Sequence, residues 1–292
     1  MKKIQKISVL TSFLGLWLTS FLSDTNQVIL GFFLIFTFGI LHGANDLVLI
    51  SQLKNRKSSH FVKILSSYII IVLISVLLFT KIPTLALLLF ILVSGYHFGE
   101  QHWQSIIKDG NTIAIKIYQF TYGLLILLLL FSFNKKEVIE IVYKITSIVI
   151  AEQLLSIILL IVILLQIVCT YILYKSSISF QENSIEQLFY VLLLCVIFKV
   201  SSLIWGFTIY FIFWHSIPSL NDQIRFLYGK YSFANFKKYF KTAFWYWIIS
   251  LLGIIALYGI SKDMVIFDAL FFSFLASITF PHAIVILKMY EK

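Results

Sequence analysis

The stretch EQLLSIILLIVILLQIVCTYILY, residues 152–174, decides the fold class of this chain. It carries no charged side chain after Glu152, and a membrane-spanning helix needs about 20 mostly apolar residues. The rest of the chain has the same character, because 60% of its 292 residues are hydrophobic, only 12% are charged and the mean hydropathy is +0.96. Soluble domains carry about 25% charged residues. The apolar runs are continuous rather than alternating, which excludes a membrane β-barrel as well as a soluble domain.

Outward from this stretch, the hydropathy predicts an all-α, polytopic integral membrane helical bundle with about ten transmembrane helices (roughly 8–10) in a single transmembrane domain, residues 1–292. The predicted spans are residues 7–22, 27–50, 61–80, 83–106, 114–133, 152–174, 186–201, 203–220, 242–260 and 264–287. Lysines precede the first span, as in a secretory signal. Because the residues before a cleavage site would be the bulky Phe21 and Leu22, we expect the first span to be retained.

Positive charge predicts the orientation of the spans. The net charge of +10 comes from short basic patches between apolar runs, which indicates topology rather than a nucleic-acid-binding face. Residues 137–151 are short for a span and are predicted to form a re-entrant or interfacial helix. With that assignment, 17 of the 23 basic residues and both termini lie on the cytoplasmic side. The six basic residues on the outer side are Lys81, Lys135, Lys136, Lys144, Lys199 and Lys262.

Residues 221–241 alternate basic and aromatic side chains between two predicted spans. This composition is typical of a segment that lies on anionic headgroups, so we predict a cytoplasmic interfacial loop in contact with membrane lipid. A lipid-facing entrance for a substrate is the alternative function of the same segment.

Four of the six histidines lie in even-numbered predicted spans, which all run in the same direction through the membrane. They are His42, His97, His215 and His282. Each lies about 12 to 18 residues from the start of its span, so the rise of about 1.5 Å per residue places all four in one layer of the cytoplasmic half. Neutral imidazole is the commonest nitrogen ligand of transition metals, and a set without cysteine suits iron, copper or zinc. The alternative is that each histidine forms a hydrogen bond between helices.

Two carboxylates and several aromatic residues accompany the histidines. Asp46 follows His42 by four residues and Glu100 follows His97 by three, so each is spaced to support an imidazole N–H, to offset metal charge or to act as a ligand itself. Gly95 leaves room for close approach of a helix or a substrate, as does Gly99. The aromatic residues predict a channel for a long apolar substrate, and they are Tyr96, Phe98, Trp103, Phe213, Trp214 and Phe280.

Four motifs carry a family resemblance. They are HGANDL (residues 42–47), GYHFGEQHW (95–103), FWHSIPSL (213–220) and FPHAIV (280–285). In this order the set resembles the bacterial Brp/Blh-type β-carotene 15,15′-dioxygenases, from about residue 27 to the C-terminus. The resemblance implies a non-haem Fe(II) enzyme of the bacterial inner membrane that cleaves β-carotene centrally with O₂ to two molecules of retinal. A microbial rhodopsin is an implied recipient of the retinal.

The resemblance also implies iron ligands. Three histidines match the ligand positions of the family, and these are His42, His97 and His215. Family members often carry a further histidine one turn after the third, where this chain has Ser219. His282 is then the expected fourth ligand and His102 the alternative. A three-histidine iron site is also chemically viable, because an oxygenase keeps coordination positions open.

Two other classes of function remain open on the sequence. One is a different membrane oxidoreductase. It could be a di-iron desaturase or hydroxylase, although the clustered histidine boxes of those enzymes are absent here, or a haem protein with axial histidines. The other is a carotenoid-binding or transport protein in which Asp46, Glu100 and the histidines form a proton path.

Overall fold

The computed structural model describes residues 2–53, 61–260 and 264–291, and the regular structure in these ranges is entirely helical. Within them, eight helices are long and apolar enough to cross a membrane, and two shorter apolar helices cover Ile4–Thr19 and Leu65–Lys81. These ten segments correspond one by one to the predicted spans. The predicted all-α polytopic membrane fold is therefore confirmed. Lys262, one of the six basic residues assigned to the outer side, lies outside the described residues.

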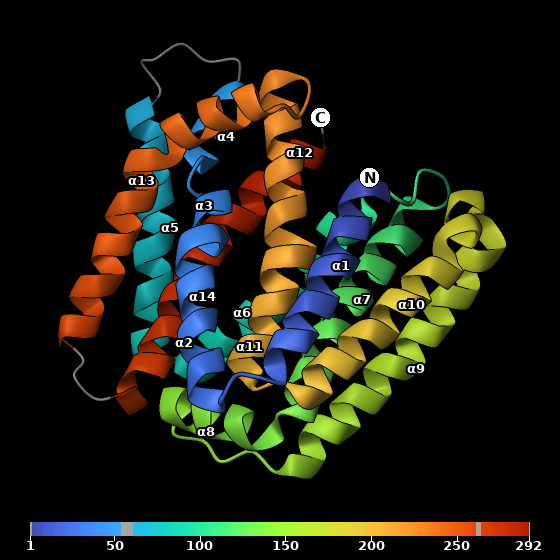
Figure 1. Cartoon of the computed structure of the whole chain (residues 1–292), viewed down its shortest axis with the longest axis horizontal. Helices are drawn as coiled ribbons and strands as arrows, with labels where there is room; N and C mark the ends of the chain where they lie inside the picture. The colour runs from blue at the N-terminus through green and yellow to red at the C-terminus, as the bar shows by residue number, and fades with distance from the viewer. Residues whose placement is uncertain (1, 54–60, 261–263, 292) are drawn as a thin grey trace. The chain divides into compact units, whose positions relative to one another are not determined.

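Figure 1 shows the helical segments in chain order. They are α1 (Lys2–Thr19), α2 (Asp24–Leu34), η1 (Ile35–Gly39), α3 (Ile40–Gly43), α4 (Asp46–Leu53), α5 (Phe61–Lys81), α6 (Pro83–Trp103), α7 (Thr112–Phe133), α8 (Lys135–Thr146), α9 (Glu152–Ser176), α10 (Ile178–Val200), α11 (Leu203–Ile209), η3 (Tyr210–Ser216), α12 (Ile217–Tyr228), α13 (Phe233–Ile260) and α14 (Met264–Tyr290). The segments η1 and η3 are π-helical turns inside longer helices, a feature that is rare and frequently found at functional sites.

The chain forms two compact units. Unit 1 comprises Met1–Ile35, Ser94–Glu140 and Val149–His215, and unit 2 comprises Phe36–Val93, Ile141–Ile148 and Ser216–Lys292. The helix α6 contributes residues to both units, as does the continuous helix formed by α11, η3 and α12.

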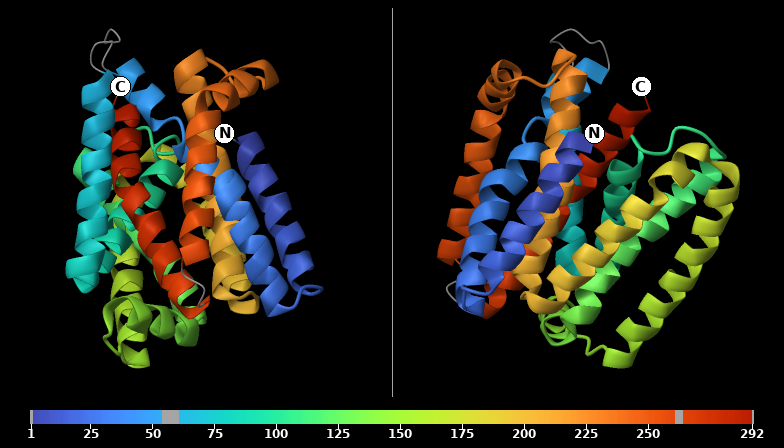
Figure 2. Two further views of the ribbon diagram at one scale, coloured as in Figure 1. Left: turned by 90° about the vertical axis from the view of Figure 1, so that its left-hand side faces the viewer. Right: turned by 45° about the vertical axis from the view of Figure 1, so that its right-hand side comes forward.

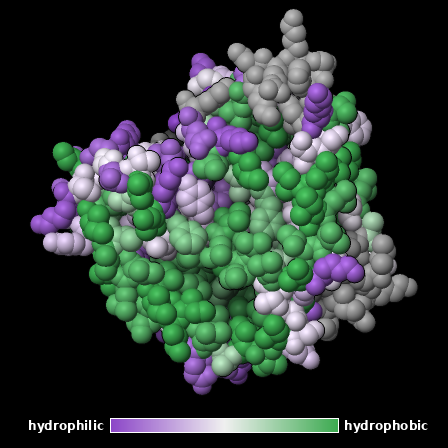
Figure 3. Space-filling view, turned by 180° about the vertical axis from the view of Figure 1, so that it is seen from behind, coloured by the Kyte–Doolittle hydropathy of each residue, from purple (hydrophilic) through white to green (hydrophobic). Residues whose placement is uncertain are grey.

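In unit 1 the helix α7 is mostly buried and packs against α9 and α10, and the three lie side by side in Figures 1 and 2. A buried hydrogen bond links two of them, because Thr121 Oγ1 donates to Gln166 Oε1 at 2.6 Å. The outer side of α9 carries exposed aliphatic side chains such as Ile157, Leu160 and Leu164. Their exposure is costly in water but favourable in lipid, which agrees with a membrane-spanning helix. Figure 3 shows apolar side chains over most of the face that it presents.

The helices α6 and α7 meet through glycine. A Cβ atom on Gly99 would lie 1.7 Å from the carbonyl oxygen of Gln119, and one on Gly123 would lie 1.8 Å from that of Gly95. The two backbones are therefore in direct contact, as expected for small residues at helix crossings in membranes. Of the two predicted uses of Gly95 and Gly99, the structure shows close helix packing.

A methyl group at this contact is expected to destabilise unit 1. Gly99→Ala places its Cβ against a main-chain carbonyl that no side-chain rotation can move, so we expect a loss of about 2–3 kcal/mol in the free energy of unfolding. Gly253→Ala is the matched control, because nothing lies within 4 Å of a Cβ at that position. Unfolding of both purified variants in detergent measures the difference, and equal stability of the two would contradict the close contact.

The connection from α6 to α7 is tied to the start of α10 by Asp109. Its carboxylate accepts hydrogen bonds from the Ile178 amide at 2.7 Å, from the Ser179 amide at 3.1 Å and from the Ser179 and Ser177 hydroxyls. It thereby satisfies donors at the N-terminus of α10. These bonds, that from the Ser179 hydroxyl above all, lower the pKa of Asp109 from 3.8 to about 2.

The lowered pKa of Asp109 predicts an acid-dependent contribution to stability. A depressed carboxyl pKa stabilises the fold above its unfolded value near 3.8, and this contribution is lost as the pH falls through about 2. We therefore expect Asp109→Asn to be less stable than the unchanged protein at pH 6, with a difference that shrinks between about pH 4 and pH 2. Unfolding curves of both proteins across this pH range test the expectation, and a difference that stays constant would contradict it.

Unit 2 contains several small apolar cores, two of which lie near its predicted ligands. One consists of Leu41, Ile224, Tyr239 and Ala243 from α3, α12 and α13. The other joins Leu49 of α4 to Val285, Ile286 and Met289 of α14. The helices α5 and α14 also pack against each other, as the left view of Figure 2 shows.

Two segments predicted to lie at the membrane surface differ from their predicted structure: the helix predicted for residues 137–151 ends at Thr146, and the loop predicted for residues 221–241 is mostly helical. The helix α8 occupies Lys135–Thr146, and at 12 residues it is not among the helices that could span. Within residues 221–241, α12 continues to Tyr228 and α13 begins at Phe233, so the turn between them is short and passes through Gly229, whose φ of +79° suits glycine. The interfacial position of both segments stays a prediction.

Candidate metal centre

Unit 2 brings together two of the predicted ligands, His42 and His282. His42 lies in α3, directly after the π-helical turn η1, and His282 lies in α14 one residue after Pro281. The two ring centroids are 4.8 Å apart at an angle of 86°, and a ligand nitrogen of one lies within 4.8 Å of a ligand nitrogen of the other. Both side chains are buried, at 5% and 4% exposure. The pair connects positions 240 residues apart in the chain.

The hydrogen bonds of this pair define which nitrogen of each ring carries a proton. His42 Nδ1 contacts the carbonyl oxygen of Gly39, and His282 Nδ1 lies 2.8 Å from Asp46 Oδ1. A carbonyl and a carboxylate oxygen only accept hydrogen bonds, so both rings are assigned the Nδ1–H form. In that form Nε2 carries the lone pair that a metal binds.

Asp46 supports a different histidine from the one that its sequence spacing suggested. It begins α4, beyond the turn that ends α3, so the regular spacing from His42 is broken and its carboxylate bonds to His282 instead. Its second oxygen, Oδ2, accepts a hydrogen bond from the hydroxyl of Tyr68 at 3.0 Å. Sequence reasoning missed Tyr68, because a single tyrosine in the apolar helix α5 carries no signal of its own.

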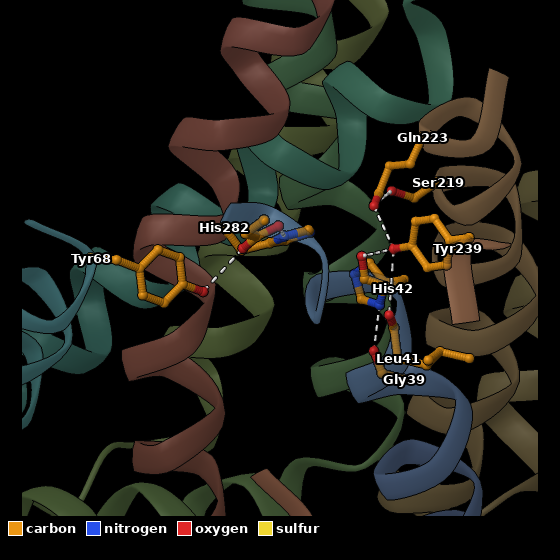
Figure 4. A network of polar contacts seen from close by, with 9 residues as sticks. Gly39, Leu41, His42, Tyr68, Ser219, Gln223, Tyr239 and His282 are labelled. Atoms are coloured by element: carbon orange, nitrogen blue, oxygen red, sulfur yellow. Dashed lines mark hydrogen bonds and ion pairs between the residues drawn. The ribbon is translucent and has the colours of Figure 1, made fainter. Parts of the chain in front are cut away.

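A buried polar network holds the backbone at His42 (Figure 4). The Tyr239 hydroxyl donates to Gln223 Oε1 at 2.7 Å and lies 3.1 Å from the carbonyl oxygen of His42. Gln223 Nε2 donates to the hydroxyl of Ser219 at 3.1 Å. Ser219 is completely buried within this network.

Unit 1 brings together the other two predicted ligands, His97 of α6 and His215 of the π-helical turn η3. Their ring centroids are 4.7 Å apart at 77°, and each side chain is only 1% exposed. Phe98 lies beside them, with its ring centroid 4.6 Å from that of His215, and Phe211 stacks on His215 at 5.6 Å. Each unit therefore contains one buried histidine pair, with aromatic neighbours in unit 1 and polar neighbours in unit 2.

The remaining polar candidates of unit 1 have other contacts. Tyr96 donates a hydrogen bond to Glu100 Oε1 at 3.1 Å, so two predicted site residues contact each other one turn apart on α6. His102 Nε2 lies 2.7 Å from Gln187 Oε1, and its ring stacks on Tyr122. This contact gives His102 a structural role in linking α6 to α10.

The predicted channel residues lie in both units, and each has packing contacts. In unit 1, Trp103 packs among aromatic residues including Tyr118 and Phe180, and Trp214 Nε1 donates to the hydroxyl of Ser12 at 2.8 Å. The Phe213 carbonyl accepts a hydrogen bond from Ser8. In unit 2, Phe280 packs against the small core of Phe79, Ala86 and Ala276. Of the six, Phe98 contacts His97 and His215, and both Trp103 and Trp214 contact the alternative ligand His102.

The chemistry of the donor set fits a transition metal. The candidate donors are imidazole nitrogens, and the two rings of unit 2 each turn Nδ1 to an oxygen acceptor, which for His282 is a carboxylate. Such carboxylate–histidine contacts fix ring orientation and raise ligand basicity in metal sites. An all-nitrogen set suits iron, copper or zinc, and gives no support for a thiolate-bound metal.

Comparison with known proteins identifies the family. The family model described as beta-carotene 15,15'-dioxygenase matches residues 33–290, which contain all four histidines of the two pairs. No curated protein and no solved structure matches the chain. The match covers most of the chain and agrees with the resemblance carried by the four motifs, and the chain therefore belongs to the β-carotene 15,15′-dioxygenase family.

Proposed function

We propose that the protein is a membrane-embedded non-haem Fe(II) oxygenase that cleaves β-carotene with O₂ to two molecules of retinal. In the net reaction the central C15–C15′ double bond breaks and each carbon receives one oxygen atom of O₂. The observation that carries the proposal is the pairing of four buried histidines within a chain of this family, two of them with Nδ1 turned to a carbonyl or carboxylate oxygen. Such a donor set is not needed for a purely carotenoid-binding role.

The proposed iron ligands are His42, His97, His215 and His282. Three of them match the ligand positions of the family, and His282 is preferred over His102 as the fourth. The ring of His282 lies beside that of the proposed ligand His42, with the centroids 4.8 Å apart, whereas the described ring contacts of His102 are with Trp103, Tyr122 and Trp214. Bound Fe(II) supplies the site at which O₂ is activated.

The chain itself contributes position and a dry environment. We assign Asp46 and Glu100 to orienting the histidines and to offsetting the metal charge. Asp46 is 2% exposed and contacts His282, and Glu100 is 4% exposed and lies on α6, the helix that carries His97. The proposed substrate channel retains Tyr96, Phe98, Trp103, Phe213, Trp214 and Phe280. Aromatic walls would hold the polyene in one position and keep water from the reacting carbons.

The substrate also fits the location. β-Carotene dissolves in the bilayer, so an enzyme built of spanning helices can take it from the lipid without passing it through water. We propose a multi-pass protein of the bacterial inner membrane with both termini in the cytoplasm. The retinal that it releases is chemically suited to a microbial rhodopsin.

Expression in a cell that accumulates β-carotene tests the proposal directly. We expect bleaching of the pigment with formation of two retinal molecules per β-carotene, measured by chromatography of extracted lipids. The absorption spectrum of the purified protein separates the alternatives, because a Soret band indicates haem, whereas bound iron without that band indicates a non-haem centre. Unchanged pigment in cells that contain folded, iron-loaded protein would rule out the cleavage activity.

A further inference from the structure

The carboxylate of Asp46 is held from two sides within unit 2. His282 of α14 lies 2.8 Å from Oδ1, and the Tyr68 hydroxyl of α5 donates to Oδ2 at 3.0 Å. Figure 4 shows Tyr68 with its hydroxyl directed toward His282, where the dashed line marks the bond to Asp46. Each carboxylate oxygen thus has its own donor, which fixes the rotation of the carboxylate plane.

Burying a carboxylate among apolar helices costs free energy unless hydrogen-bond donors surround it. Asp46 is 2% exposed, and no lysine or arginine among the described residues forms an ion pair with it. Its charge is therefore accommodated by the imidazole N–H and the phenol O–H. A hydrogen bond to an ionised acceptor is stronger than one between neutral groups, so Tyr68 contributes appreciably to the position of the carboxylate.

Tyr68 is the residue of its stretch of α5 that turns a polar group inward. The next residues, Ile69 and Ile70, are about half exposed, and Ser67 is also exposed, so this part of α5 is largely a surface helix. Tyr68 is half-buried and directs its polar end inward to Asp46. Phenylalanine would fill the same apolar position equally well, and would lack only the bond to the carboxylate.

We propose that Tyr68 is a positioning residue for the metal centre, which acts through Asp46 to hold the His282 ring in the Nδ1–H form with Nε2 presented to the metal. This inference rests on the proposed function in taking His282 as an iron ligand. Without the Tyr68 hydroxyl the carboxylate is free to rotate, and the His282 ring loses its fixed orientation and tautomer. Partners of this kind beyond the ligands tune metal affinity in other metal sites.

The first test needs no metal. Nitrogen NMR of the metal-free protein in lipid nanodiscs, with labelled histidine and His282→Gln to assign the signal, reports which ring nitrogen carries the proton. We expect the unchanged protein to show the Nδ1–H form of His282. Tyr68→Phe should lower the ratio of Nδ1–H to Nε2–H by about threefold or more, the scale of one lost hydrogen bond. The Asp46→Asn protein should show a larger change.

The second test measures affinity. Titration with Co²⁺, whose visible spectrum reports histidine coordination, and with Fe²⁺ in competition with a chelator should give dissociation constants about 3- to 10-fold higher for Tyr68→Phe. For Asp46→Asn, we expect an increase of about 10- to 100-fold. Tyr290→Phe is the matched control. Tyr290 lies on α14, the helix that also carries His282, and its hydroxyl donates to the carboxylate of Asp222 at 3.1 Å.

The outcomes separate this inference from the proposed function. An unchanged tautomer and unchanged metal affinity in Tyr68→Phe overturn the inference while leaving the oxygenase proposal intact. Equal losses in Tyr68→Phe and Tyr290→Phe also overturn it, because they indicate general loosening of the unit. A tautomer shift in Tyr68→Phe alone, in a protein that binds neither metal, supports the positioning role and contradicts the iron centre.

Discussion

Cells that make β-carotene are expected to keep their pigment when they express His42→Ala or His97→Ala, although the unchanged protein bleaches them. Each substitution removes a proposed iron ligand, one from the histidine pair of each unit. We expect the rate of retinal formation to fall by more than about 100-fold, beyond the 10- to 100-fold typical of residues that only support a ligand. The iron content of the purified variants should fall with the activity. Chromatography and metal analysis of the same preparations measure both quantities.

A matched substitution distinguishes loss of a ligand from loss of the fold. Gln166→Leu removes a buried polar side chain from the membrane-spanning helix α9, where it bonds to Thr121, and leaves every proposed ligand in place. We expect this variant to retain iron and to bleach the cells. Retinal formation by the His42→Ala or His97→Ala protein at the unchanged rate would show that the histidine is not required.

Most of the fold could be predicted from the sequence because the bilayer restricts it. A chain in lipid must satisfy its backbone hydrogen bonds internally, so long apolar runs such as residues 152–174 form helices regardless of their neighbours. The helix α9, Glu152–Ser176, differs from that predicted span by two residues. The depth argument also selected the four histidines that the structure arranges in buried pairs. Their role as ligands stays a prediction.

The contacts between helices could not be predicted in the same way, because they depend on packing that a single helix does not encode. The four-residue spacing places Asp46 beside His42 only in one regular helix, and the turn before α4 breaks that helix and brings the carboxylate to His282. The π-helical turns η1 and η3 have no recognisable sequence pattern, and they rotate the residues that follow relative to a regular helix. Tyr68 lies on a helix that contains no site motif.

The second large effect is expected on Fe²⁺ binding when the proposed fourth ligand is replaced. We expect His282→Ala to weaken Fe²⁺ binding by more than about 100-fold, as for the other ligands, whereas His102→Gln should change it by less than about threefold. The reason lies in their partners. The His282 ring lies 4.8 Å from that of His42, centroid to centroid, and its Nδ1 contacts Asp46, whereas His102 contacts Gln187 and joins two helices. His102→Gln should instead lower the free energy of unfolding by about 1 kcal/mol.

Ser219→His in the His282→Ala background tests the same assignment from the other side. A histidine at this position lies four residues after His215, one helical turn away, so the two imidazoles lie on the same side of the helix and can share a metal. We expect partial recovery of iron binding, because Ser219 is completely buried and hydrogen-bonded to Gln223, which leaves the larger ring crowded. Chelator competition on the single and double variants measures the recovery. If His282→Ala binds iron normally and His102→Gln does not, the fourth ligand is His102 rather than His282.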